Sequence, residues 1–183
     1  MAYTTSEGNG NNAPREKKGF FSERIIYVCE SRGDERTPYL TRWFLLQIEE
    51  PFQFMICLHK FHRSDDDDAT HDHPWDFLTV PLWRGYYDVT EPVLSSGIEN
   101  LRLSVEEKDS LHELNYKKQR CWPLIPYFRK AEHRHRVELF KDKQGKEKVA
   151  YTLVLMFKRR KRWGFFTKFG YKDFLDYFKD NGC

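Results

Sequence analysis

Two histidines separated by one residue, His71 and His73, are the strongest chemical signal in this sequence. They lie in the stretch 70–77, between an acidic loop and an apolar run with β-branched residues. In a strand, residues two apart point to the same face, so both imidazoles would converge on one point. Two converging imidazoles make half of a transition-metal site. The pair therefore predicts a metal centre that needs at least one further ligand.

A second pair of histidines, His133 and His135, could complete this site. We favour His135 as the third ligand, because Val137 and Leu139 follow it on the same face of a predicted strand. His133 lies nearer the charged loop 129–132, but it has the same strand parity and stays open as the alternative. The predicted metal ligands are thus His71, His73 and His135.

The basic run 158–162, followed by aromatic residues at 163–166, has three interpretations. It can be a solvated strand end, or its arginines can reach the barrel interior and hold an anionic substrate, since guanidinium groups match carboxylate and phosphate. It could also bind single-stranded nucleic acid, but we expect no nucleic-acid partner. Arg160 and Arg129 are the predicted substrate-binding residues, and Arg42 is a further anion-holding candidate.

Short runs of aromatic and β-branched residues must position these groups, and they predict strands. The predicted strands cover residues 24–29, 39–48, 52–61, 77–89, 97–105, 111–122, 127–140 and 149–158. In the tail, apolar residues at 171, 174, 175 and 178 follow a helical period, which predicts an amphipathic helix over 171–180. The pattern predicts an all-β barrel or sandwich with a closing C-terminal helix.

The ordered motifs of this chain resemble those of the cupin superfamily, and more closely those of small uncharacterised cupin-like proteins of bacteria and phages. The matching pieces, which cover roughly residues 40–166, are Leu58-His59-Lys60, Ser64-Asp65, His71-Asp72-His73-Pro74-Trp75-Asp76-Phe77, Gly85-Tyr86, His135-Arg136-Val137 and Trp163-Gly164-Phe165. The resemblance implies a double-stranded β-helix barrel with a divalent metal at its mouth. Cupins usually bind that metal with two histidines and a glutamate from the first motif and a histidine from the second.

This sequence departs from the cupin ligand set at the glutamate. The expected position falls at or beside Phe77 and Leu78, and the nearest carboxylate is Asp76. Three histidines still form a reasonable site for a divalent transition metal such as Fe, Ni, Mn or Zn, and they leave coordination positions open.

Length and composition favour one domain: a disordered arm at 1–18, rich in Gly, Asn, Ser and charge, and a cupin-like domain at 19–183. The arm could order on a partner surface and make homo-oligomer or assembly contacts. A formal net charge of +3 is too small to imply a nucleic-acid or membrane partner. We find no signal peptide, no apolar run of membrane-spanning length and no CxxC pair, and so expect a cytoplasmic protein, with virion association as an alternative.

These observations predict a metal-binding, cupin-like protein with a small-molecule ligand or substrate. As an enzyme it would be a metal-dependent oxygenase or hydroxylase acting on a small or anionic substrate, a step that depends on the family analogy. The alternative is a non-catalytic ligand-binding or structural assembly protein, viral in one version, that retains the barrel. No catalytic residue is assigned.

Overall fold

The computed structural model describes residues 3–5, 22–28, 37–49, 51–65, 69–91, 116–167 and 169–180. Within these ranges the chain forms short and medium strands and one helix. The elements are β1 (Tyr3–Thr5), β2 (Glu23–Val28), β3 (Pro38–Ile48), β4 (Phe54–Phe61), β5 (Thr70–His71), β6 (Trp75–Trp83), β7 (Tyr86–Thr90), β8 (Lys117–Cys121), β9 (Tyr127–Arg129), β10 (Arg136–Leu139), β11 (Ala150–Arg159), β12 (Gly164–Thr167), β13 (Gly170–Asp173) and α2 (Phe174–Asp180).

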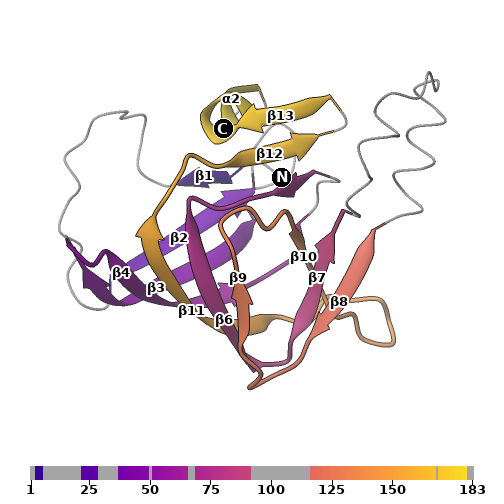
Figure 1. Ribbon diagram of the computed structural model, residues 1–183. Coiled ribbons are helices and arrows are strands. Elements are labelled where there is room, and N and C mark those ends of the chain that lie inside the picture. Colours follow the sequence, from indigo (N-terminus) through magenta and orange to yellow (C-terminus); the bar gives the residue numbers. More distant parts are fainter. Residues whose placement is uncertain are drawn as a thin grey trace.

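The described strands form three antiparallel sheets (Figure 1). The large sheet has the order β1-β2-β3-β4-β11-β6-β9. A second sheet, β10-β7-β8, is joined to it by the tight turn between β6 and β7. The third, β13-β12-β5, lies at one end of the barrel beside α2 (Figure 1). The chain is therefore predominantly β, as the sequence predicts.

Alternating burial along β11 shows how the large sheet builds the interior. Ala150, Thr152, Val154 and Met156 are buried, while the residues between them are only partly so. Their neighbours on β4 and β6 follow the same alternation, since cross-strand partners share a face. The inner face of the large sheet thus supplies one wall of the barrel, and the sheet β10-β7-β8 faces it.

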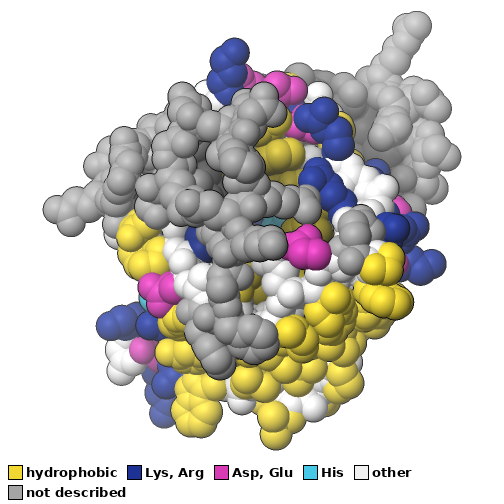
Figure 2. Space-filling view, turned by 90° about the vertical axis from the view of Figure 1, so that its left-hand side faces the viewer, with side chains coloured by type: hydrophobic (Ala, Val, Ile, Leu, Met, Phe, Trp, Pro, Cys, Tyr) yellow, Lys and Arg dark blue, Asp and Glu magenta, His cyan; other side chains and the backbone are white. Residues whose placement is uncertain are grey.

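The opposite face of the large sheet is also partly apolar. Phe157 continues the outward positions of β11 and packs against Phe54 of β4 and Phe128 of β9, with ring centroids 5.8 and 6.2 Å apart. Figure 2 shows hydrophobic side chains gathered over the lower part of one face of the molecule. This aromatic row ties the outer surfaces of β4, β11 and β9 together.

The turn between β6 and β7 divides the run 77–89 that the sequence presents as continuous. Arg84 has a positive φ of 60°, and a side chain on Gly85 would collide with the backbone carbonyl of Cys121. Glycine is therefore required there, because β7 and β8 approach each other too closely for a Cβ. This turn sends β7 back across the barrel opposite β6.

The C-terminal helix is confirmed, but its predicted start is wrong. α2 begins at Phe174, whereas residues 170–173 form β13 and pair with β12. Gly170, with a φ of 106°, closes that hairpin, and Tyr171 packs on Phe166 across it at 5.2 Å. Tyr171 has the spacing of the helical pattern but lies in strand β13. α2 itself packs Tyr177 on Phe165, with stacked rings 3.9 Å apart.

Two predicted regions fall largely outside the described residues. They are the strand expected at 97–105 and the N-terminal arm at 1–18. Within the arm, Tyr3–Thr5 forms β1 and pairs with residues 26–28 of β2. No helix in the described part of the chain is long and apolar enough to cross a membrane.

Candidate metal centre

Three histidines from distant parts of the chain meet at one end of the barrel. His71 ends β5, His73 follows it, and His135 directly precedes β10. The three pairs of ring centroids are 5.0, 5.1 and 5.0 Å apart. Nε2 of His73 lies 2.8 Å from Nε2 of His135, and one ring nitrogen from each residue falls within 4.8 Å of the others. The structure thus brings together the three residues predicted as ligands.

Backbone pairing explains why these residues meet. His71 and His135 form an isolated antiparallel bridge, with N–O distances of 2.9 and 3.0 Å in the two directions. The amide of His73 donates to the carbonyl of Ala131 at 3.0 Å. The two histidine segments therefore lie side by side because their backbones are joined directly.

A buried carboxylate between the first two histidines fixes their loop. Asp72 is 2% exposed, accepts a hydrogen bond from the amide of Gly164 at 2.9 Å and pairs with Lys161. These contacts tie the loop to the connection between β11 and β12. Asp72 is thus occupied in holding the loop and does not face the histidine cluster as a ligand.

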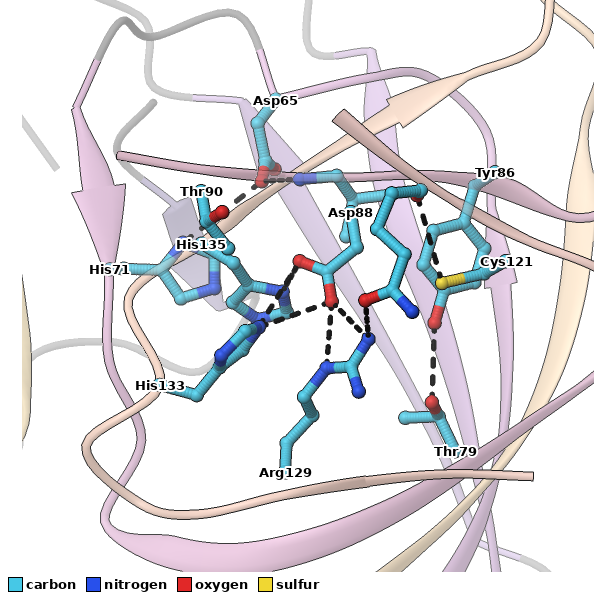
Figure 3. A network of polar contacts seen from close by, with 12 residues as sticks. Asp65, His71, Thr79, Tyr86, Asp88, Thr90, Cys121, Arg129, His133 and His135 are labelled. Atoms are coloured by element: carbon cyan, nitrogen blue, oxygen red, sulfur yellow. Dashed lines mark hydrogen bonds and ion pairs between the residues drawn. The ribbon is translucent and has the colours of Figure 1, made fainter. Parts of the chain in front are cut away.

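Asp88 on β7 supports His135 from behind (Figure 3). Its carboxylate lies 2.9 Å from Nδ1 of His135, 3.1 Å from Nε2 of His133 and 2.8 Å from Nε of Arg129. Because a carboxylate only accepts, His135 donates from Nδ1, and its Nε2 is directed at the cluster. An outer carboxylate of this kind orients a metal-binding histidine and increases its basicity.

Sequence reasoning missed Asp88, although a signal was present. The segment 86–90 reads Tyr-Tyr-Asp-Val-Thr, so a charged residue occupies a strand position otherwise suited to burial. A buried carboxylate is costly without partners, so its presence in a strand points to a built polar network. The network could be located only once the fold placed β7 beside β10.

His133 lies beside the cluster and bonds to Asp88, at 3.1 Å. Asp88, His133 and His135 also have ligand atoms within 4.8 Å of one another and form a second conceivable metal group. Arg129, however, pairs with the same carboxylate at 2.8 Å, and its charge disfavours a further cation there. We therefore regard Asp88 and His133 as support for His135.

Burial sets the protonation of the cluster. It lowers the pKa of His71 to about 4 and, together with the neighbouring histidines, lowers the pKa of His73 well below its ordinary value. Burial alone would raise the pKa of Asp88, but the facing His135 and His133 hold it well below its usual range. At neutral pH His71 and His73 are therefore neutral, as metal ligands must be, and Asp88 is ionised.

The donor set fits a small divalent transition metal. Imidazole nitrogens bound at about 2.0–2.1 Å to a tetrahedral ion lie about 3.3 Å apart. Nε2 of His73 and Nε2 of His135 lie 2.8 Å apart, at hydrogen-bond distance, so the two rings would have to separate slightly to hold an ion. Aromatic rings wall the cluster: Phe77 lies 4.4 Å from the His73 ring, and Phe165 lies 5.8 Å from the His71 ring. Asp76 instead accepts from the amide of Ala131 at 2.7 Å and pairs with Arg160, so Phe77 stands where a carboxylate ligand was expected.

The two arginines predicted to bind substrate already have carboxylate partners. Arg129 pairs with Asp88 and donates to Gln119 at 2.8 Å. Arg160 is about half exposed and pairs with Asp76 at 2.6 Å and with Glu132 at 3.5 Å. Arg129 is thus linked to the histidine cluster through Asp88. The contacts described for Arg160 place its side chain on the outside of the barrel.

Several solved structures are similar to this chain at low sequence identity. A cupin domain from Bordetella pertussis Tohama I is 12% identical, with a TM-score of 0.38, over 63% of this chain and 91% of that chain. Hydroxypropylphosphonic acid epoxidase from S. wedmorenis is 12% identical, with a TM-score of 0.43, over 65% of this chain and 51% of that chain. KdgF from Halomonas sp. is 16% identical, with a TM-score of 0.41, over 78% and 96%.

The chain spans about half the length of the epoxidase that it matches. No protein-family model matches the sequence, and no curated protein does. At these identities and TM-scores the similar structures identify neither an activity nor a ligand for this chain. The predicted all-β fold with a C-terminal helix is confirmed by the arrangement of the chain's own strands.

Proposed function

We propose that the chain is a metal-binding protein in which His71, His73 and His135 hold one divalent transition metal. The convergence of three ring nitrogens within 4.8 Å carries this proposal. Two further features support it. Asp88 orients His135 from behind, and burial keeps His71 neutral by lowering its pKa to about 4. Iron, nickel, manganese and zinc all bind imidazole, and the donor set does not choose among them.

We further propose that the centre is catalytic and acts on a small or anionic substrate, as an oxygenase or hydroxylase. When bound, the metal would supply Lewis acidity or, as iron, reactivity toward O2. Three protein ligands leave coordination positions open for a small molecule. The rings of Phe77 and Phe165 would exclude water from that side, while His71 keeps part of its surface exposed (14% of its side chain).

Elemental analysis of the purified chain tests the metal. We expect about one transition-metal ion per chain, with loss of the ion and a lower melting temperature after chelation. A second measurement tests the open positions: the cobalt-loaded chain should change its visible spectrum when azide is added. Absence of any metal, with a melting temperature unaffected by chelator, would refute the proposal.

A cobalt spectrum that azide does not alter would refute the catalytic part alone. The metal would then have a structural role, and the alternative of a ligand-binding or assembly protein that retains the barrel would be favoured. The two measurements therefore separate the two parts of the proposal.

A further inference from the structure

Arg42 is a cation on the inner face of the large sheet. It lies on β3, directly opposite His59 on β4, which is buried at 6% exposure. Nε of Arg42 donates to Nε2 of His59 at 2.9 Å. Burial lowers the pKa of Arg42 from its ordinary value. The guanidinium is thus held inside the barrel by a specific hydrogen bond.

Nothing in the described residues neutralises this charge. Arg42 has no carboxylate within ion-pair distance there, and its cross-strand partner on β2 is Arg24, another cation. Its hydrogen-bond partner is uncharged at neutral pH, because burial and Arg42 lower the pKa of His59 well below 6.5. Two like charges in register on one face are unfavourable unless an anion joins them.

Other arginines of the chain show what Arg42 lacks. Arg129, whose side chain is largely buried, pairs with Asp88 at 2.8 Å, and even the exposed Arg162 pairs with Asp173 at 2.9 Å. Interior cations in proteins are normally paired in this way. Arg42 therefore presents the charge of a salt bridge whose acidic partner is missing from the described residues.

The hydrogen bond to His59 also selects the shape of an anion. It occupies Nε and leaves the two terminal nitrogens of the guanidinium as a pair of parallel donors. Such a pair matches the two oxygens of a carboxylate. Because His59 accepts at Nε2, its own proton is on Nδ1, so the contact is a neutral one that positions Arg42 without reducing its charge.

Arg42 also belongs to the surroundings of the candidate metal centre. Arg42 lies on the same face of β3 as Phe44, two residues further along the strand. Phe44 packs in one buried cluster with Phe77, whose ring centroid lies 4.4 Å from that of His73. Arg42 and His73 therefore face a common interior. An anion between them would meet a guanidinium on one side and the metal ligands on the other.

We propose that Arg42, positioned by His59, binds the carboxylate of a small-molecule ligand or substrate of the histidine metal centre. This assignment rests on the proposed metal-binding function and narrows its anionic substrate to a small carboxylic acid. The proposed anion-binding residue is therefore Arg42, in place of the predicted Arg129 and Arg160. Those two have carboxylate partners, whereas Arg42 has none among the described residues.

Saturation-transfer difference NMR, used to measure propionate binding to the zinc-loaded full chain, tests the proposal. Propionamide, which has the same shape without the charge, is the matched ligand control. We expect propionate to bind with a millimolar Kd and propionamide to give no signal. Arg42→Gln should weaken propionate binding at least about tenfold, since a charge-assisted pair of hydrogen bonds is lost. Arg162→Gln, at an exposed arginine, is the matched protein control and should leave binding unchanged.

Arg42→Lys covers the case in which the glutamine variant does not fold, as judged by its melting curve. It keeps the charge but loses the paired donors, so we expect an affinity reduced about threefold or more. No binding of propionate to the wild-type chain, or equal binding by the wild type and the folded Arg42 variants, would overturn the proposal.

Repeating the propionate-binding measurement after treatment with EDTA tests the carboxylate site separately from the metal site. A chain that binds no zinc but still binds propionate through Arg42 would refute the metal centre and keep the carboxylate site. If the chain binds zinc but the wild type and Arg42→Gln bind propionate with equal affinity, only the carboxylate site is refuted.

Discussion

Histidines occupy two described regions of the barrel, and the two use them differently. At the mouth, His71, His73 and His135 direct ring nitrogens at one another, with centroids about 5 Å apart. On β4, His59 accepts from Arg42, and just after β4 His62 contacts the hydroxyl of Thr41 at 2.9 Å. Each of these rings is committed to its own neighbour. Convergence of three ring nitrogens on one point, and not histidine content, therefore distinguishes the candidate metal site from the structural histidines.

Removing the converging histidines should break this contrast most strongly. We expect the double variant His71→Ala, His73→Ala to retain no stoichiometric metal, because one remaining imidazole cannot hold an ion against solvent. The double variant His59→Gln, His62→Gln is the matched control and should keep about one ion per chain. Elemental analysis of both proteins measures the difference, and equal metal contents would contradict the assignment.

Changing the carboxylate behind His135 should have an intermediate effect. Asp88→Asn keeps the shape but removes the charge that orients the ring and increases its basicity, so zinc affinity should fall about 10- to 100-fold. Competition with a chromophoric chelator measures this change.

Arg129→Gln is the control for Asp88→Asn, since it removes another partner of Asp88 and leaves the contact with His135 intact. It should lower the free energy of unfolding while changing zinc affinity less than Asp88→Asn does. If both variants bind zinc as tightly as the wild type, Asp88 has no orienting role.

The structural histidine region should give the smallest effect, visible in the pH dependence of stability. Because burial and Arg42 lower the pKa of His59 well below 6.5, the folded chain resists a proton that the unfolded chain accepts. Stability is therefore full above about pH 6.5 and is lost as the pH falls below it. His59→Gln keeps an acceptor for Arg42 but does not titrate. Between pH 7 and 5 its urea-unfolding free energy should fall less steeply than that of the wild type, by up to about 1.4 kcal/mol per pH unit.

Parallel curves for the wild type and His59→Gln would show that His59 titrates alike in the folded and unfolded chains. The contrast between the two histidine regions would then lose one of its supports, since His59 would not be held neutral by its surroundings.

Much of this architecture follows from local pattern. The alternation of β11 and the spacing of His71 and His73 are visible in the sequence because strand geometry repeats every two residues. His135 groups with His71 and His73 within 4.8 Å, whereas His133 groups with Asp88 and His135, and the choice of His135 as the third ligand stays a prediction. These features depend on residues that are close in the chain.

What the sequence could not provide depends on which strands become neighbours. Asp88 and Arg129 form their pair only because β7 and β9 approach each other across 41 positions of chain. Arg42 reads as one of many basic residues until the fold places it inside the barrel, opposite Arg24 and His59. Tyr171 is a case in which a local pattern misleads. Its spacing fits a helix, but it lies in β13, where its ring packs on Phe166 across the hairpin.

The backbone bridge between His71 and His135 has a consequence for the rate at which a metal would exchange. These two residues are joined by two backbone hydrogen bonds, of 2.9 and 3.0 Å, so neither can swing away without opening the junction between β5 and the segment before β10. His73 lies outside any strand and, among the described residues, has one backbone hydrogen bond, from its amide to the carbonyl of Ala131. We therefore expect ion release to begin at His73, with the other two histidines remaining as a preformed pair that recaptures the ion.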